Sequence, residues 1–430
     1  MGKSNNYFWL YGNISVILGL KSIIMNILFL THNLNINHNP AAIADSHFIA
    51  ALSSCGHKVS IIVDELEDEN VSWLTYEKLI HIRKEKSLPF YHRIPKLGAI
   101  PFYLDGIPGR FKTKIPEWRR IIEVELKENH YDLIISSGSI IFPHLMFKFF
   151  KNSVPWIINI HDPMPFSTYP PPYFYRENLK WNSEGLYYRR LELLVKNIFR
   201  NATQIFMPSL LLKERLEKFY GKLEKVSIIP HVHTELRHLP TQENDNVLNE
   251  QLNDFIQAGD FVIIHAGRLY KNRKIKPFLK AFENFLPNKK IKFIQVGEVS
   301  DENKKIIHLF KSLNQQILVF EKRISYKKSL ELIERSDAAL IIELDNDESP
   351  FLPSKFSDIL FFQKPMIALT PKKSEIRRLL GADYPFIASP NDQEEIQHVL
   401  DRLLKVQKKC YSSELIDKIK PKYLCERIRM

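Results

Sequence analysis

The sequence predicts an α/β protein with two Rossmann-like, doubly wound domains that face each other across a cleft. Short, continuous apolar runs alternate with helical segments along most of the 430 residues, which is typical of parallel strands covered on both faces. This alternation is interrupted by a polar stretch at residues 231–253 and then starts again. A chain of this length also exceeds what one hydrophobic core usually supports.

The expected segments are a leader, an N-terminal Rossmann-like domain, a linker, a C-terminal Rossmann-like domain and basic C-terminal helices, at residues 1–24, 25–230, 231–253, 254–392 and 393–430. The leader is apolar over Phe8–Leu20, but this run is short for a bilayer span and precedes no small-residue cleavage site. We interpret the leader either as an upstream start or as a weak membrane anchor.

The composition indicates which kind of partner and which cellular compartment to expect. A formal charge of +12 favours an anionic partner such as a nucleic acid, a membrane surface or a phosphorylated substrate. Cys55, Cys410 and Cys425 are too few and too scattered for a disulfide framework or a zinc cluster, which favours a reducing compartment. We therefore expect a cytoplasmic protein.

The first half opens with a strand at residues 26–30, a helix from Pro40 to Ser54 and a strand at residues 59–63. The loop between the first strand and the helix contains no G-x-G-x-x-G, so a dinucleotide cofactor is not expected there. Further strands are predicted at residues 133–136, 156–160, 204–207 and 226–229, with helices at 141–150, 177–200 and 210–220.

Residues 84–120 depart from this alternation, because they are rich in proline, aromatic and basic residues. Basic side chains between aromatic ones would suit contact with anionic lipid headgroups at the inner face of a membrane. An ordinary surface excursion packed on its own aromatic residues is the alternative.

His161 follows the strand at residues 156–160, and the carboxyl ends of parallel strands form the functional edge of such a sheet. A histidine there is a candidate catalytic residue. Taken alone, it is more often a hydrogen-bonded structural histidine.

The second half is expected to have strands at residues 261–266, 292–296, 317–320, 338–342 and 366–369, with helices at 276–285, 302–313 and 327–336. A further helix opens at Ser354, between the last two strands. The loop from Glu343 to Lys355 therefore lies where an anionic ligand would be held.

Positive charge gathers after the first strand of the second half. Gly267 permits a close backbone approach, and Arg268, Lys271, Arg273 and Lys274 follow it. Guanidinium groups match phosphate oxygens, so a diphosphate is the expected ligand. A plain basic surface loop is the alternative.

Ser354 is a suitable helix N-cap, and Lys355 puts a cation in the first turn, where the helix dipole prefers an anion. A bound phosphate would explain that placement. Asp358 lies one turn into the same helix and could accept hydrogen bonds from a ribose, although an ordinary first-turn acid fits equally well.

Several stretches match a known family together: Gly267-Arg268 with Arg273, Gly297, the helix from Ser325 to Asp337, and SPFLPSKFSDILFFQKPMIAL from Ser349 to Leu369. The opening MNILFLTHN, GHKVSIIV and the strand that ends at His161 are similar too. In these residues the chain resembles the retaining, nucleotide-sugar-dependent glycosyltransferases of family 4, which have the GT-B fold.

The resemblance implies roles for individual residues. Arg268 or Arg273 would hold the donor diphosphate together with Lys355, and Asp358 matches the second acid of the E-x7-E motif, the ribose ligand. The first acid of the motif falls at Pro350, so Glu348 is the candidate to serve the sugar. The predicted catalytic residues are therefore His161 and Glu348. The predicted donor-binding residues are Gly267, Arg268, Arg273, Lys274, Gly297, Ser354, Lys355 and Asp358.

Asp345-Asn346-Asp347 spells D-x-D, the metal signature of the other common glycosyltransferase fold. GT-B enzymes generally stabilise the leaving diphosphate with basic groups and a helix N-terminus, so no catalytic metal and no cofactor are expected.

The resulting hypothesis is a hexosyltransferase-like enzyme that moves a sugar from a nucleoside-diphosphate sugar to a glycan or lipid-linked acceptor in cell-surface polysaccharide or glycolipid synthesis. The alternatives are a non-catalytic GT-B scaffold and a GT-B nucleotide-sugar epimerase. A nucleic-acid binder would explain the charge but not the two-domain sheet pattern, so no nucleic-acid partner is expected.

Overall fold

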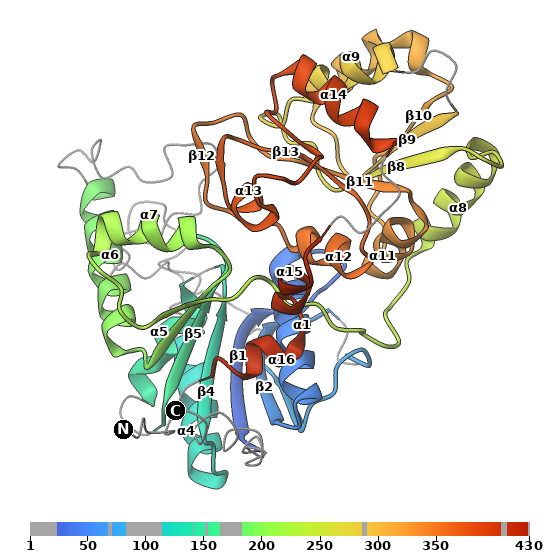
Figure 1. Cartoon of the computed structure of the whole chain (residues 1–430). Coiled ribbons are helices and arrows are strands. Elements are labelled where there is room, and N and C mark those ends of the chain that lie inside the picture. The colour runs from blue at the N-terminus through green and yellow to red at the C-terminus, as the bar shows by residue number, and fades with distance from the viewer. Residues whose placement is uncertain are drawn as a thin grey trace, which may run out of the picture.

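The structure, a computed structural model, describes residues 24–67, 71–82, 114–139, 141–150, 154–163, 183–285, 290–405 and 411–428. These residues form two α/β halves, one above the other in Figure 1, and each half is built on a parallel sheet. The predicted leader, apart from its last residue, lies outside the described residues. So does most of the predicted insert at residues 84–120.

The first half contains a sheet of strand order β3-β2-β1-β4-β5-β6-β7. Its strands are β1 (Asn26–Asn33), β2 (Lys58–Glu65), β3 (Lys78–His81), β4 (Leu133–Gly138), β5 (Trp156–Ile160), β6 (Gln204–Met207) and β7 (Val226–Ile228). In β1, Ile27 pairs with Val59 of β2 on one side and with Leu133 of β4 on the other. The strand order reverses between β1 and β4, and ligands bind at such switch points in doubly wound sheets.

Helices cover both faces of this sheet: α1 (Pro40–Ser54), α4 (Ile115–Glu128), α5 (Phe142–Leu145), the 3₁₀ segment Met146–Phe149, α6 (Ser183–Asn201) and α7 (Leu210–Tyr220). The N-terminus of α1 is capped by Asn39, whose side chain accepts from the backbone N–H of Ala41 at 2.9 Å. Because the strands are buried on both faces, two apolar clusters sandwich the sheet.

The second half contains a sheet of strand order β10-β9-β8-β11-β13-β15, and this order reverses between β8 and β11. Its strands are β8 (Phe261–Ala266), β9 (Ile291–Val296), β10 (Ile317–Phe320), β11 (Ala338–Ile342), β13 (Met366–Leu369) and β15 (Ile387–Ala388). A small parallel pair, β12 (Glu348–Ser349) and β14 (Lys373–Ser374), lies beyond it.

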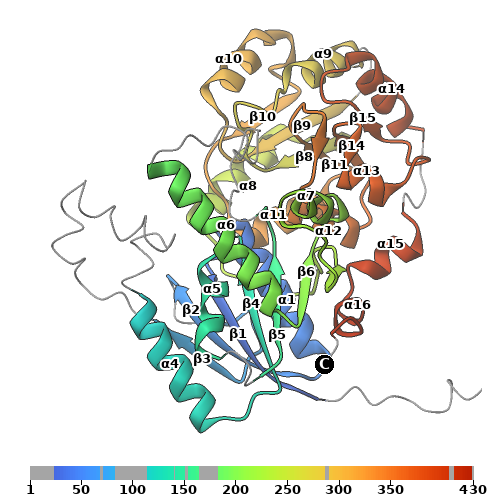
Figure 2. The ribbon, with the colours of Figure 1, turned by 90° about the vertical axis from the view of Figure 1, so that its left-hand side faces the viewer.

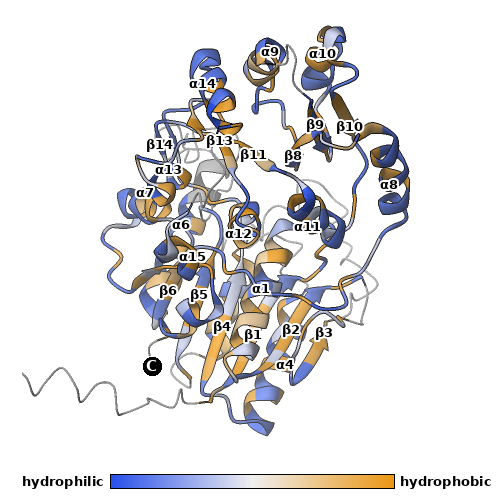
Figure 3. Cartoon of the chain, turned by 45° about the vertical axis from the view of Figure 1, so that its right-hand side comes forward, coloured by the Kyte–Doolittle hydropathy of each residue, from blue (hydrophilic) through white to orange (hydrophobic). Residues whose placement is uncertain are grey.

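The second sheet is flanked by α8 (Glu243–Phe255), α9 (Lys276–Phe285), α10 (Asp301–Leu309), the 3₁₀ segment Lys311–Leu313, α11 (Tyr326–Arg335), α12 (Ser354–Phe361), α13 (Glu375–Leu380) and α14 (Gln393–Leu403). Figure 3 shows hydrophilic and hydrophobic residues mixed along α8 and α14, while β2 and β3 of the first sheet are largely hydrophobic. One continuous core serves this half.

The C-terminal helices α15 (Ser413–Lys418) and α16 (Pro421–Cys425) return to the first half, where α16 packs against α1 (Figures 1 and 2). Leu424 is fully buried in the cluster that includes Met25. Cys55 and Cys425, which we expected to be reduced, form a disulfide that joins the end of α1 to α16. The pairing was not foreseeable from spacing, because 370 residues separate the two cysteines.

Other element predictions need correction. The expected single helix at 141–150 is divided, because it tightens into a 3₁₀ segment after Leu145. The predicted linker contains the helix α8, whose Leu248 and Leu252 pack into the second core one turn apart. The end of the predicted insert, from Ile115 on, is the start of α4.

Among the described residues, none of the helices combines the length and the apolar character that crossing a membrane requires.

Candidate functional site

Two glycines bring the backbone close together at the switch point of the second sheet. Gly267 directly follows β8 and Gly297 directly follows β9. Gly297 has a φ of +115°, and a Cβ on it would lie 2.9 Å from the carbonyl oxygen of Gly267. Gln295 holds the same carbonyl through an Nε2 hydrogen bond of 2.8 Å. No Cβ fits at Gly297, so backbone atoms of the two glycines form the floor of the site.

Lys355 reaches this floor from α12. A Cβ added to Gly267 would lie 3.0 Å from the Lys355 ammonium, so the lysine occupies the space that the glycine leaves. Burial, together with the nearby Arg273 and Arg268 guanidinium groups, lowers the pKa of Lys355 to about 8. A buried cation next to other cations is stabilised strongly by an anion, because the anion offsets both the cost of burying the charge and the repulsion from the two arginines.

The two arginines predicted to bind the donor lie beside this lysine, whereas Lys274 does not. Arg273 donates to the carbonyl oxygen of Arg268 at 3.4 Å and stacks on Tyr270 at 5.2 Å, and its Nε is buried without a partner among the described residues. Arg268 pairs with Glu298 at 3.1 Å. The Lys274 side chain is exposed to solvent. Sequence reasoning therefore placed three of these basic side chains together, and a fourth faces outward.

The N-terminus of α12 lies at the same place, since Lys355 is its second residue. The N-cap is Pro353 and not Ser354, which is the first helical residue, and no side chain caps this end. Our expectation that Ser354 caps the helix was wrong. Proline fits here because its backbone adopts the extended φ and ψ of an N-cap. The N–H of Phe356 donates to the carbonyl oxygen of Pro353 at 2.9 Å, and the N–H groups that precede it in the first turn are the ones that an anion would meet.

Asp358 lies deeper in α12 and is held by two donors. Its Oδ1 accepts from Tyr326 at 2.8 Å and from His233 Nδ1 at 3.0 Å, and the side chain is buried. The Tyr326 hydroxyl also contacts His47 Nε2 at 2.7 Å, and His47 Nδ1 accepts from the backbone N–H of Thr234 at 3.0 Å. This network joins α1 of the first half to α11 and α12 of the second. The other oxygen of Asp358, Oδ2, accepts no hydrogen bond from the part of the chain that the structure describes.

His47, His233 and Asp358 offer ligand atoms within 4.8 Å of one another, which is close enough to hold a metal ion. The Tyr326 hydroxyl, however, already bridges His47 and Asp358. The donors and acceptors of this cluster are therefore matched without an ion, as buried polar groups usually are.

The two acids near the loop of residues 343–349 have different partners. Glu348, predicted to be catalytic, pairs with Arg215 of α7 and, at 3.3 Å, with Lys373, so it links the two halves. Burial would raise its pKa, but the hydrogen bonds from these two cations hold the pKa below its usual range.

Glu343, which sequence reasoning did not single out, is buried at the end of β11 and accepts from Ser349 at 2.6 Å. Burial raises its pKa to about 7.

The residues of the D-x-D triplet are engaged elsewhere. Asp345 accepts a hydrogen bond from Asn391, and both Asp345 and Asp347 are exposed. Neither aspartate belongs to a cluster of potential metal ligands among the described residues.

The switch point of the first sheet has a different composition. His161, at the end of β5, is 8 % exposed, and its Nε2 lies 2.8 Å from Oδ1 of Asp45 in α1. Asp45 also accepts from Thr31 of β1 at 2.6 Å and from Ser137 of β4. These are the two strands between which the order reverses, so Asp45 joins His161 to the switch point. The position of His161 at the carboxyl end of its strand is the one predicted from the sequence.

His231 connects the two switch points. Its ring lies 5.4 Å from that of His161, and it also bonds to the backbone of Leu352, just before α12. Its carbonyl oxygen accepts from Ser357 of α12. His161 and the N-terminal part of α12 are therefore separated by one side chain of the connecting segment, residues 229–242 between β7 and α8.

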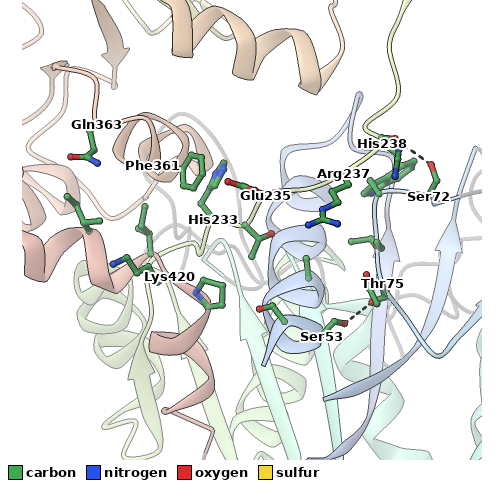
Figure 4. Close-up of a pocket in the computed structure, with 18 residues that line it drawn as sticks. Ser53, Ser72, Thr75, His233, Glu235, Arg237, His238, Phe361, Gln363 and Lys420 are labelled. Carbon is green, nitrogen blue, oxygen red and sulfur yellow. Dashed lines mark hydrogen bonds between the residues drawn. The ribbon is translucent and has the colours of Figure 1, made fainter. Parts of the chain in front are cut away.

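A pocket of about 870 Å³ lies on another part of the junction, between α1, the connecting segment and the C-terminal helices (Figure 4). Figure 4 shows Ser53 bonded to Thr75, Ser72 bonded to His238, and His233 beside Phe361. None of the predicted donor-binding or catalytic residues lines this pocket.

The fold agrees with comparisons to known proteins. Residues 46–232 match the family Glycosyltransferase Family 4. The chain is a glycosyltransferase with a family 4 domain. A search of curated protein sequences found no match.

Solved structures show that this glycosyltransferase has the GT-B fold. Sucrose-phosphate synthase from Thermosynechococcus elongatus is similar with a TM-score of 0.59 and 13% identity, over 94% of this chain and 97% of that one. HepE of Anabaena, in complex with UDP and glucose, has a TM-score of 0.56 and 14% identity, over 94% and 95% of the two chains. A glycosyltransferase from Rickettsia africae has a TM-score of 0.56 and 13% identity, over 94% and 93%.

Sequence reasoning missed the partners that hold the predicted residues. Asp45, Tyr326 and His233 lie 116, 32 and 125 residues from the side chains they bond. A polar ending of β4, Ser136-Ser137-Gly138, was the one local signal, because polar residues at the end of a buried strand indicate a functional edge.

Proposed function

We propose that this glycosyltransferase transfers a sugar from a nucleoside-diphosphate sugar to a glycan or lipid-linked acceptor, with retention of configuration and without a catalytic metal. The observation that carries the proposal is the position of Lys355. Lys355 belongs to the first turn of α12, and its ammonium lies against Gly267 and beside Arg273. A diphosphate placed there would meet two kinds of donor, the free N–H groups of the helix and the basic side chains.

Such a site favours departure of a diphosphate. Negative charge develops on the leaving diphosphate during glycosyl transfer, and fixed cations and helix N–H groups stabilise it without reorganisation. The remaining task is to position donor and acceptor between the two halves. Asp358 has an oxygen that accepts nothing from the described residues, and we assign that oxygen to the ribose hydroxyls.

We assign the acceptor to the side of the first half, and the product to cell-surface polysaccharide or glycolipid. The basic and aromatic residues at 84–120 support a contact with the inner face of a membrane, and most of them lie outside the described residues. The pairing of Glu348 with Arg215 and Lys373 argues for a different role than direct contact with the sugar, that of holding the two halves together.

A non-catalytic scaffold is the second candidate, and Pro350 favours it, because proline stands where the resemblance places the first acid of the motif. Turnover separates the two candidates.

The experiment is a thermal-shift panel of UDP-, GDP-, ADP- and CMP-sugars in EDTA, followed by a hydrolysis assay for the released nucleotide. HepE binds UDP and glucose in its crystal, so UDP-glucose is the first donor to test. Stabilisation by one nucleotide that survives EDTA and disappears in Lys355→Ala supports the proposed donor site. Binding without release of nucleoside diphosphate would favour the scaffold, and no stabilisation by any donor would overturn the proposal.

A further inference from the structure

The two ring nitrogens of His161 have different surroundings. Nε2 contacts the Asp45 carboxylate at 2.8 Å. Nδ1, on the other side of the ring, is buried without a hydrogen-bond partner among the described residues. Buried polar atoms of native proteins are rarely left in this state, so Nδ1 calls for a partner outside the described protein atoms, such as a bound ligand or a water.

Asp45 is itself fixed from several sides. Its Oδ2 accepts from Thr31 at 2.6 Å, and its Oδ1 accepts from Ser137, which in turn accepts from Asn159 Nδ2 at 2.8 Å. These partners come from β1, β4 and β5, and Asp45 comes from α1. A carboxylate bonded in this way has one orientation, and it imposes that orientation on the imidazole it contacts.

We propose that Asp45 is a positioning residue of the transfer reaction: it accepts the Nε2–H of His161 and so directs Nδ1 of His161 to an oxygen of the transferred sugar or of the acceptor. This inference rests on the proposed function. No step of it requires a bond between His161 and the sugar. Because Asp45 contacts the substrate only through His161, its effect must vanish when His161 is absent.

The charges around His161 favour a protonated ring. Burial lowers the pKa of His161, but the adjacent Asp45 carboxylate and the charge of Asp162 outweigh burial, and the pKa is raised. His144 of α5 and His231 of the connecting segment also face this ring. Burial lowers the pKa of His144 to about 4 and that of His231 to about 3, so both are neutral near pH 7.

A protonated His161 can donate from both nitrogens, so Nδ1 would donate to the substrate oxygen. The protonated form of His161 is present below its pKa and is lost as pH rises through that value. Activity should therefore fall on the alkaline side, where His161 loses its proton. Removing the Asp45 charge should move that fall to lower pH.

The test compares wild type, Asp45→Asn, His161→Gln and the double variant. Asp45→Asn keeps the shape and removes the charge. It should lower kcat by about 10- to 100-fold, leave the KM for the donor within about threefold, and shift the alkaline limb of the kcat/KM profile to lower pH. In the His161→Gln background, Asp45→Asn should cost no further activity, as expected for residues that act as a unit.

Glu125→Gln is the matched control. Glu125 is another buried acid of the first half and bonds Lys78, Asn129 and Tyr131, on α4 and away from β5. It should change stability but neither kcat nor the pH profile. Thr31→Val, which removes one of the hydrogen bonds to Asp45 without touching charge, should give a smaller fall in kcat of about 2- to 5-fold.

A readout independent of activity keeps the test valid if the proposed function fails. The His161 ring can be titrated by NMR, with its signal assigned from the spectrum of His161→Gln. Its pKa should fall in Asp45→Asn and stay constant in Glu125→Gln. If wild type transfers no sugar, the proposed function fails while this titration still reports the pairing. An unchanged His161 pKa in Asp45→Asn, an unshifted pH profile, or additive losses in the double variant would overturn the inference.

Discussion

The two sheets of this glycosyltransferase share a topology, yet their switch points have opposite chemistry. At the first, between β1 and β4, the Asp45 carboxylate contacts His161 and outweighs burial, so the pKa of His161 is raised. At the second, between β8 and β11, Lys355 and Arg273 lie around bare glycine backbone. Three acids lie on that side: Glu298 pairs with Arg268, Asp358 is held by Tyr326 and His233, and burial raises the pKa of Glu343 to about 7.

This difference indicates a division of labour. An edge with clustered basic side chains and a helix N-terminus suits a diphosphate. An edge with a histidine bonded to a carboxylate suits the bond that is being made or broken, because the protonation of the ring depends on that carboxylate. Variants at the two edges should therefore separate donor binding from turnover.

The largest expected effect is on donor binding at the second switch point. Lys355→Ala should weaken nucleoside-diphosphate binding by about 10- to 150-fold, the equivalent of about 1.5–3 kcal/mol for a charged hydrogen bond. Isothermal titration calorimetry measures it. Lys305→Ala, on the exposed surface of α10, is the control and should leave Kd unchanged. Equal Kd values for the two variants would refute the placement of the diphosphate.

Gly297→Ala tests the backbone floor of the same site. Its Cβ would meet the carbonyl oxygen of Gly267 at 2.9 Å, so we expect a loss of about 3 kcal/mol in the free energy of unfolding. Gly259→Ala is matched, because Gly259 has a φ of +84° and open space around its Cβ, and it should cost about 1 kcal/mol. Denaturant unfolding gives both values, and similar losses would show that the close approach does not matter.

The pH dependence of donor binding sharpens the contrast further. The pKa of Lys355 is lowered to about 8, so the empty site loses this cation as pH rises through that value. Donor affinity should fall by about tenfold between pH 8 and pH 9.5 in wild type. Lys355→Arg keeps its charge throughout and should show a flat profile. A wild-type profile as flat as that of the arginine variant would be evidence against the buried lysine.

A separate effect, on stability and not on binding, concerns Glu343. Its folded-state pKa is raised, so the wild type loses stability as pH rises from about 4.5 towards 7, whereas Glu343→Gln stays neutral. The variant should gain about 3 kcal/mol relative to wild type across this window and no more above it. Thermal unfolding at several pH values measures the difference. A constant difference across the window would mean that Glu343 is ionised throughout.

The sequence predicted the parts of this picture that depend on local pattern. The apolar runs gave both sheets, because buried parallel strands have a distinctive composition. Gly267, Arg268, Arg273 and Lys355 were brought together because the carboxyl ends of neighbouring strands meet at one edge.

The parts that depend on distant contacts were not predictable in the same way. The Asp45 partner of His161 and the Tyr326 partner of Asp358 belong to other elements, and α8 was read as linker because its two core leucines stand among polar residues. A sequence shows which residue types reach an edge, but three-dimensional packing decides which of them pair.

The most direct test of the division of labour is the binding of UDP in EDTA, measured by calorimetry on wild type, Lys355→Ala and Asp45→Asn. We predict that Lys355→Ala loses binding by at least about tenfold while Asp45→Asn binds as wild type does. Loss of binding in Asp45→Asn with full binding in Lys355→Ala would reverse the assignment of the two edges and contradict the account.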